Sequence, residues 1–189
     1  EAATPEKQIE IINQLVAQNV AGIAIAANDA DALQPALTEA MDAGIKVISL
    51  DSAVNKDSRQ THIQQADPEK IGRGLIQAAY EMVDGNGGIA VLSATAQATN
   101  QNLWIEWMKK ELEENPEKYA NTPLVKVAYG DDDPTKSTSE TQALLTDSSI
   151  KVIIAPTTVG MLAAGKVLQD KQSDVKLTGL GLPSEMAPF

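Results

Sequence analysis

The sequence predicts an α/β protein with two doubly wound parallel-sheet lobes that are incomplete at both termini. Strand-like apolar runs alternate with helical stretches along the 189 residues, and such alternation favours parallel sheets with right-handed crossovers. Two of the runs, residues 88–93 and 150–155, are apolar almost throughout, as expected of strands that helices cover on both faces. A short strand, residues 61–65, breaks this rhythm and links two βα blocks. We therefore expect part of an N-terminal lobe in residues 1–66 and most of a C-terminal lobe in residues 67–189.

The N-terminal block is expected to begin with a helix. Residues 5–18 carry apolar side chains at helical spacing, and Thr4 before a proline supplies a cap. Residues 20–27 (VAGIAIAA) form a nearly unbroken apolar run, which predicts a strand covered on both faces. A helix over residues 31–43 and a second buried strand over residues 45–50 complete the block.

The C-terminal block continues the same alternation. After the linking strand, we expect helices over residues 68–83, 100–114, 134–146 and 157–169, and strands over residues 88–93, 124–129, 150–155 and 175–180. A chain that starts with a helix and ends on a strand without a covering helix leaves both blocks unfinished. We therefore expect it to be a piece of a longer protein.

Composition excludes several classes of protein. The chain is 43% apolar and 22% charged, so it can bury a core, and no apolar run approaches the ~18 residues of a membrane span. The net charge of −11 argues against nucleic acid or an anionic membrane as partner, because phosphate binding needs clustered Lys and Arg. The absence of cysteine excludes disulfides and thiol chemistry.

Polar segments follow two of the predicted strands, ATNQN at residues 98–102 and APTTVG at residues 155–160. Ligands of open parallel sheets bind beyond the carboxyl ends of the strands, so these amides and hydroxyls lie where a small polar molecule would bind. Neither segment contains the His, Cys or Lys that covalent or acid–base chemistry usually needs. We expect a binding protein without catalytic residues or cofactor. The acidic loop at residues 131–133 lacks EF-hand spacing, so we expect no metal site either.

The chain resembles the sugar-binding proteins of bacterial ABC importers in the type I periplasmic-binding-protein superfamily. The resemblance is carried by VAGIAIAANDADALQPALTEAMDAGIKVISLDSAV, ATNQNLWIEWMKKEL, YGDDDPTKSTSETQALL, IKVIIAPTTVGMLAAGKVL and VKLTGLGLPSEM. It is greatest for the branch that holds rhamnose-binding and autoinducer-2-binding proteins. The family implies a Rossmann-like fold of two lobes that hold a ligand between them. It also implies that the first strand and helix and the C-terminal return segments are not in this sequence.

The resemblance implies a set of ligand-binding residues. Asp51 at the end of a strand matches an aspartate that binds ligand hydroxyls, with a turn residue as the alternative. Asn100 and Gln101 match a pair that reads Asp-Gln in autoinducer-2 binders, although Asn100 could instead cap a helix. The remaining expected contacts are Pro156, Thr157, Thr158 and Asn28, with helix capping as the alternative for each Thr. Trp104 could stack on a sugar ring, but its place within a helix favours packing.

The expected function is that of an ABC-transporter substrate-binding component that captures rhamnose or a related deoxy-hexose. Its partners would be the sugar and a membrane permease, and we expect an exported, periplasmic or extracellular protein that is monomeric when complete. Its signal peptide is not in this chain. The first alternative is an autoinducer-2-binding protein of the same family, which Asn100 and Thr158 disfavour. The second is the effector domain of a sugar-responsive repressor, and an α/β enzyme is the third.

Overall fold

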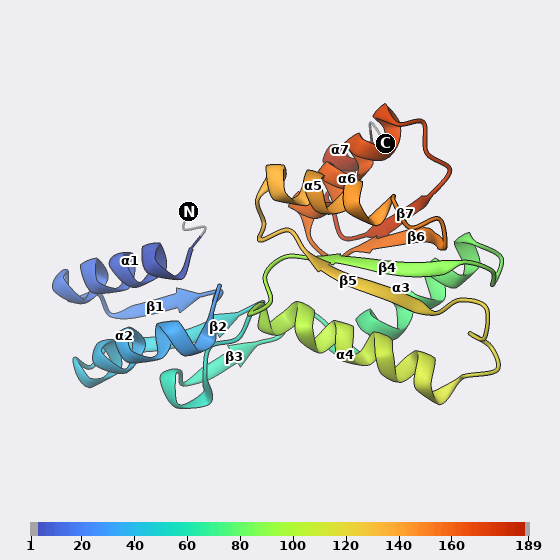
Figure 1. Cartoon of the computed structure of the whole chain (residues 1–189). Coiled ribbons are helices and arrows are strands. Elements are labelled where there is room, and N and C mark those ends of the chain that lie inside the picture. The colour runs from blue at the N-terminus through green and yellow to red at the C-terminus, as the bar shows by residue number, and fades with distance from the viewer. Residues whose placement is uncertain (1–3, 188–189) are drawn as a thin grey trace. The chain divides into compact units, whose positions relative to one another are not determined.

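The computed structural model describes residues 4–187, and the chain divides into two compact units (Figure 1). The first unit comprises the described residues up to Asp67 together with Gln97–Asn102. The second comprises Pro68–Ala96 and the described residues from Leu103 onward. The lobe boundary near Asp67 stays a prediction about the complete protein. Within this chain, residues 97–102 group with the first unit although they follow Asp67 in the sequence.

The first unit contains a parallel sheet of three strands in the order β1-β2-β3. Its strands are β1 (Gly22–Ile25), β2 (Lys46–Leu50) and β3 (Thr61–Ile63), and its helices are α1 (Pro5–Ala17), α2 (Ala30–Asp42) and the short 3-10 helix η1 (Lys56–Ser58). The side chain of Thr4 caps α1 by accepting from the Lys7 amide, and Asp29 caps α2 by accepting from the amides of residues 31 and 32.

The core of the first unit lies on one face of this sheet. Ile12 of α1 and Leu37 of α2 pack against Ile23 and Val47 of the strands. Strand residues on the opposite face, such as Leu50, remain exposed. The prediction that residues 20–27 form a strand buried on both faces is therefore wrong. Exposed and buried residues alternate along β1 because both helices pack on the same face.

The second unit contains a parallel sheet of four strands in the order β5-β4-β6-β7. Its strands are β4 (Gly88–Ser93), β5 (Leu124–Tyr129), β6 (Ile150–Ala155) and β7 (Lys176–Gly179). Its helices are α3 (Pro68–Met82), α4 (Thr99–Glu114), whose first turn belongs to the first unit, α5 (Pro134–Leu144), α6 (Thr158–Asp170) and α7 (Pro183–Met186).

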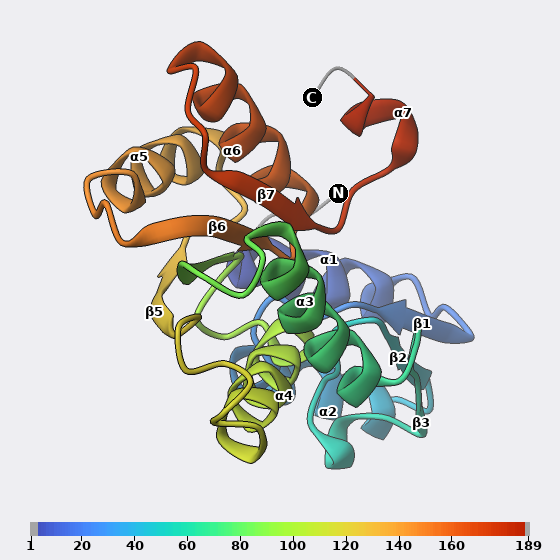
Figure 2. The ribbon, with the colours of Figure 1, turned by 90° about the vertical axis from the view of Figure 1, so that its right-hand side faces the viewer.

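Helices cover both faces of the second sheet, with α3 and α4 on one face and α5 and α6 on the other (Figures 1 and 2). The side chains of β4 accordingly point alternately into two clusters. Ile89 and Val91 contact the cluster that contains Trp104 and Met108, whereas Leu92 contacts the cluster under α5 and α6. Every residue of β4 is buried, as its continuous apolar run predicts.

The predicted α/β class is confirmed, and the differences in element bounds are small. Strands β4, β5 and β6 have the predicted bounds, whereas β1, β2, β3 and β7 are shorter than predicted. Two short helices, η1 and α7, were not predicted, because neither is long enough to show a helical repeat. None of the helices in the described part of the chain is both long and apolar enough to cross a bilayer.

Candidate functional site

Asp51 is the first polar residue after β2 and belongs to the first unit. Its φ is 55°, in the left-handed region that Asp and Asn tolerate better than most residues. Its amide donates to the Ile63 carbonyl of the neighbouring strand at 3.3 Å. This backbone turn presents the carboxylate beyond the carboxyl ends of β2 and β3, the end of a parallel sheet at which ligands bind.

Asn100 lies in the first turn of α4, and the structure brings it together with Asp51. Its Nδ2 donates to Asp51 Oδ1 at 3.0 Å, and its Oδ1 accepts from the Gln101 amide at 2.7 Å. Asn100 is 8% exposed, so the bond to the Gln101 amide is buried, whereas the bond to half-buried Asp51 is partly shielded from water. The capping alternative for Asn100 is wrong, because α4 begins one residue earlier at Thr99.

Thr99 joins this helix start to the loop that follows β2. Its Oγ1 lies 3.0 Å from Ser52 Oγ and donates to the Ala53 carbonyl at 3.2 Å. These bonds explain why residues 97–102 group with the first unit. They also hold Asn100 and Gln101 beside the strand end that carries Asp51.

Gln65 is a polar contact of Asp51 that is absent from the set expected from the sequence. Its Nε2 donates to Asp51 Oδ1 at 2.7 Å. The residue follows β3, which pairs in parallel with β2, so the carboxyl ends of these strands are neighbours. The signal in the sequence was a pair of glutamines, residues 64 and 65, at the end of the predicted linking strand, which in the structure ends at Ile63.

Asn28 lies after β1, the other neighbour of β2 in the sheet. Its amide donates to Gln8 Oε1 at 2.9 Å, and Gln8 Nε2 donates to the Ala26 carbonyl at 2.7 Å. The amide of Ala27 donates to the Ser52 carbonyl at 3.0 Å, which joins the segments after β1 and β2. Asn28 and Asp51 thus both follow carboxyl ends of adjacent parallel strands.

The candidate residues of the second unit follow β6. Pro156 and Thr157 are buried, and Thr158 is half-buried as the first residue of α6. The capping alternative for the Thr157 hydroxyl is wrong: the residue stands at the N-cap position, but its side chain makes no capping bond. Instead its Oγ1 donates to the carboxylate of Asp132. Gly160 leaves room for this arrangement, since a Cβ there would lie 2.7 Å from Thr157 Cγ2.

Asp132 is a second polar residue absent from the set expected from the sequence. Asp131 and Asp132 have φ values of 53° and 50°, so the loop after β5 contains two consecutive left-handed residues. The amides of Gly130 and Asp131 donate to the carbonyls of Ser93 and Ala94, each at 2.9 Å, which fastens this loop to the end of β4. The motif YGDDDP after a strand was its sequence signal.

The candidate residues of the first unit and those of the second unit offer hydrogen-bonding groups rather than reactive ones. The first unit presents a carboxylate held by neutral amides, and the second presents a hydroxyl whose proton is directed at a carboxylate. Both suit an uncharged ligand rich in hydroxyl groups. Within residues 4–187, acidic and histidine side chains form no group of three or more that could hold a metal ion. Trp104 is 3% exposed within the core and is not available for stacking on a sugar.

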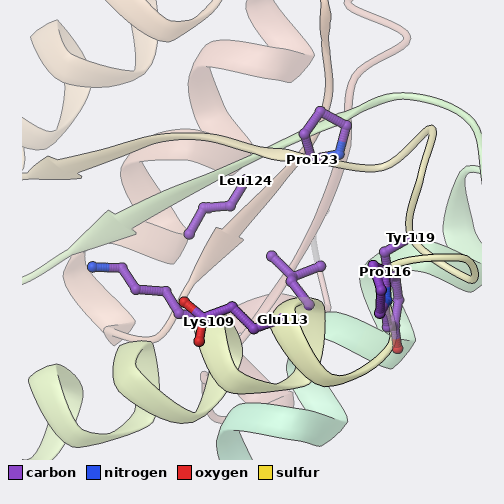
Figure 3. A pocket seen from close by; sticks show the side chains of 7 residues that line it. Lys109, Glu113, Pro116, Tyr119, Pro123 and Leu124 are labelled. Carbon is purple, nitrogen blue, oxygen red and sulfur yellow. The ribbon is translucent and has the colours of Figure 1, made fainter.

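A pocket of about 460 Å³ lies at the other end of the second sheet (Figure 3). Its walls come from the last turns of α4, the following loop and the start of β5, and include Leu112, Pro116, Tyr119 and Leu124. Leu124 is the first residue of β5, whereas Thr157 lies two residues after the end of β6. In this parallel sheet the pocket therefore lies at the opposite end from Pro156, Thr157 and Thr158, the predicted binding residues that follow β6 in the second unit.

Comparison with known proteins gives a consistent family assignment. A family model described as a periplasmic binding protein domain matches residues 1–189. An ABC transporter solute-binding protein from Clostridium phytofermentas, solved with bound L-rhamnose, is 53% identical with a TM-score of 0.95. The match covers 100% of this chain and 59% of that protein.

Two further solved structures extend the comparison. A sugar ABC transporter protein from Actinomyces odontolyticus is 40% identical with a TM-score of 0.65, and the match covers 99% of this chain and 61% of that one. LsrB from Clostridium saccharobutylicum in complex with AI-2 is 25% identical with a TM-score of 0.88, over 98% of this chain and 60% of that one. The chain thus spans about 60% of the length of these proteins. The family resemblance noted in the sequence is confirmed, and the chain belongs to the periplasmic binding protein domain family.

Proposed function

We propose that the complete protein is the solute-binding component of an ABC transporter and captures a 6-deoxy-hexose such as rhamnose. The observation that carries this proposal is the 53% identity, over the whole of this chain, to a solute-binding protein solved with L-rhamnose. No bond is made or broken in this function. The bound sugar is delivered to a membrane permease, which places the protein on the periplasmic or extracellular side of the membrane.

The chemistry of the candidate residues supports an uncharged polyol. Asp51 is an acceptor for ligand hydroxyls, and charge-assisted hydrogen bonds are roughly twice as strong as neutral ones. Thr157 donates its proton to Asp132, so its oxygen lone pairs remain as acceptors. Asn28, Gln101, Pro156 and Thr158 remain proposed ligand contacts.

The energy needed for such binding is modest. A micromolar dissociation constant corresponds to about −8 kcal/mol. Spread over the roughly eleven heavy atoms of a deoxy-hexose, this is about 0.7 kcal/mol per atom, well below the ceiling for small ligands. A few hydrogen bonds and the burial of one sugar ring therefore suffice.

Autoinducer-2 is the alternative ligand, because the AI-2 complex of LsrB has a similar fold. In the autoinducer-2 binders that the sequence resembles, an aspartate stands at the position of Asn100. Here the Asn100 amide donates to Asp51. An aspartate at position 100, 3.0 Å from the Asp51 carboxylate, would repel it. The Asn100 amide therefore favours a ligand whose hydroxyl groups are arranged differently from those of autoinducer-2.

Calorimetric titration of the full-length protein tests the proposal. The ligands are L-rhamnose, other 6-deoxy sugars, ribose and autoinducer-2. We expect rhamnose or a close relative to bind with a dissociation constant of about 1 μM or below. Binding of autoinducer-2 with no response to any sugar would contradict the proposed ligand and support the alternative.

A further inference from the structure

The Asp51 carboxylate receives two hydrogen bonds on the same oxygen. Gln65 Nε2 lies 2.7 Å from Oδ1 and Asn100 Nδ2 lies 3.0 Å from it. Two donors use the two lone-pair directions of one carboxylate oxygen, and the other oxygen then remains the acceptor for further donors. Both donors are neutral amides, so neither brings a positive charge to the carboxylate.

We propose that Gln65 is a positioning residue that orients the Asp51 carboxylate for the sugar. This inference rests on the proposed function. Gln65 does not itself contact the ligand. It occupies Oδ1, so that Oδ2 is directed toward the ligand hydroxyls.

The end of β3 restrains both the backbone and the side chain of Asp51. The Asp51 amide donates to the Ile63 carbonyl at 3.3 Å, and Gln65, two residues further on, binds the carboxylate. Asp51 has a left-handed φ of 55°, so its side-chain direction depends on these contacts more than in a regular strand. Two donors from different segments restrict rotation of the carboxylate about its Cα–Cβ and Cβ–Cγ bonds more than the Asn100 donor would by itself.

Gln65 also lies two residues before the point where the first unit ends, at Asp67. A sugar that fixes the Asp51 carboxylate therefore also fixes the segment at residues 64–67. We expect sugar binding to slow amide hydrogen exchange in this segment, and to do so through Gln65. A purely structural role for Gln65 would not make this protection depend on the sugar.

A change from donor to acceptor tests the role without altering side-chain shape. In Gln65→Glu a carboxylate replaces the amide next to Asp51, and the repulsion should weaken sugar binding about tenfold. The matched control is Gln64→Glu, which adds the same charge one residue away. Gln64 is exposed, and its Oε1 lies 2.9 Å from His62 Nε2, so its carboxylate form keeps an acceptor there. We expect a change of less than twofold in the control.

A double-mutant cycle with Asp51→Asn separates an effect of Gln65 that acts through Asp51 from a general loss of structure. With Asn at position 51 the repulsion is gone, so adding Gln65→Glu should weaken binding by less than twofold. Titration of the full-length variants and hydrogen exchange with and without L-rhamnose supply the readouts. Equal affinity of wild type and Gln65→Glu, or an equal loss in both backgrounds, would overturn the role of Gln65 while leaving the proposed function intact. A wild-type protein that binds none of the sugars would overturn the proposed function, and this inference with it.

Discussion

Asp51 combines a left-handed backbone with a charged side chain held by two amides. Such conformations cost free energy, and they persist where the surroundings over-determine them, as they often do at binding sites. Its surroundings include the Ile63 carbonyl as well as the two amides. The resemblance to sugar-binding proteins predicted this residue, which follows a strand end, but its partners come from segments 14 and 49 positions away in the chain.

Removal of the negative charge at Asp51 should weaken sugar binding about tenfold. Asp51→Asn is the suitable variant, because Asn tolerates the left-handed φ and keeps the side-chain shape while it removes the charge and replaces one acceptor oxygen by an amide donor. The loss reflects the conversion of charge-assisted bonds into neutral ones. Titration of the full-length protein gives the value, and Asp57→Asn, at an exposed residue of η1, is the control. Unchanged affinity would remove Asp51 from the binding residues.

The hydroxyl of Thr157 should contribute measurably to the stability of the second unit. Thr157→Val keeps the side-chain volume but deprives Asp132 of its donor. We expect the free energy of unfolding to fall by about 1 kcal/mol, because the exposed carboxylate can regain water. Urea unfolding followed by tryptophan fluorescence measures it. Thr158→Val, at a half-buried neighbour, should change stability by less than about 0.5 kcal/mol, and equal losses would contradict a special role for Thr157.

At the scale of elements, α3 and α4 are joined by an ion-pair network that the sequence did not reveal. Arg73 binds Glu69 and Glu111, each at 2.9 Å, and Glu114 at 2.7 Å. Glu111 is also bound by Gln77 and Tyr119. Its carboxylate is buried, and three donors from α3 and the loop after α4 converge on it. Spacing along one helix cannot indicate such contacts between helices.

The pKa of Glu111 links this network to pH. Burial acts to raise this pKa, but hydrogen bonds from Arg73, Gln77 and Tyr119 outweigh it and lower the pKa below the ordinary value of 4.5. A carboxylate with a lowered folded-state pKa stabilises the fold above the unfolded-state pKa. That stability is lost as the pH falls through the folded-state value.

Glu111→Gln should therefore destabilise the second unit at neutral pH and much less in acid. We expect the free energy of unfolding to fall by about 2 kcal/mol at pH 7, because hydrogen bonds to a charged carboxylate are replaced by weaker bonds to a neutral amide. The difference from wild type should shrink as Glu111 becomes protonated below its ordinary pKa. Urea unfolding at a series of pH values, followed by tryptophan fluorescence, measures both quantities. Glu113→Gln on the exposed side of α4 is the control, and a pH-independent difference would contradict the network's role.

At the scale of the whole molecule, the two units have separate cores. The cluster of the first unit includes Leu33, Leu37 and Val47, and the clusters of the second are built from residues 76 to 164. Both tryptophans, Trp104 and Trp107, lie in the second unit. Tryptophan fluorescence therefore reports on the second unit, whereas hydrogen exchange can report on each.

Leu37→Ala should destabilise the first unit selectively. Leu37 is fully buried in α2, and truncation of such a leucine typically costs about 2–5 kcal/mol. Amide protection in α1, α2, β1 and β2 should fall, while the tryptophan transition in urea keeps its midpoint. Ala32→Gly on the exposed side of α2 is a milder control, expected to cost about 1 kcal/mol. If the free energy of unfolding from tryptophan fluorescence falls as much as that from amide protection in the first unit, the two units unfold together.

The sequence alone determined the α/β class, the order of elements and the strand ends at which polar residues gather. These properties are local: apolar runs, helical spacing and caps such as Asp29 act over a few residues. It also indicated Asp51 and Asn100 as binding residues, which remain proposals. Their pairing, by contrast, needed the neighbouring strand ends and the start of α4 to be placed.

Only the tertiary structure decided which side chains meet. Gln65 binds Asp51, Asp132 binds Thr157, and both α1 and α2 pack on one face of the first sheet. The apolar run at residues 20–27 could not reveal that one face of β1 is exposed, because small apolar residues suit either environment. Hydrogen-bond partners and the covered face of a strand depend on segments far apart in the chain, and local sequence patterns carry no signal for them.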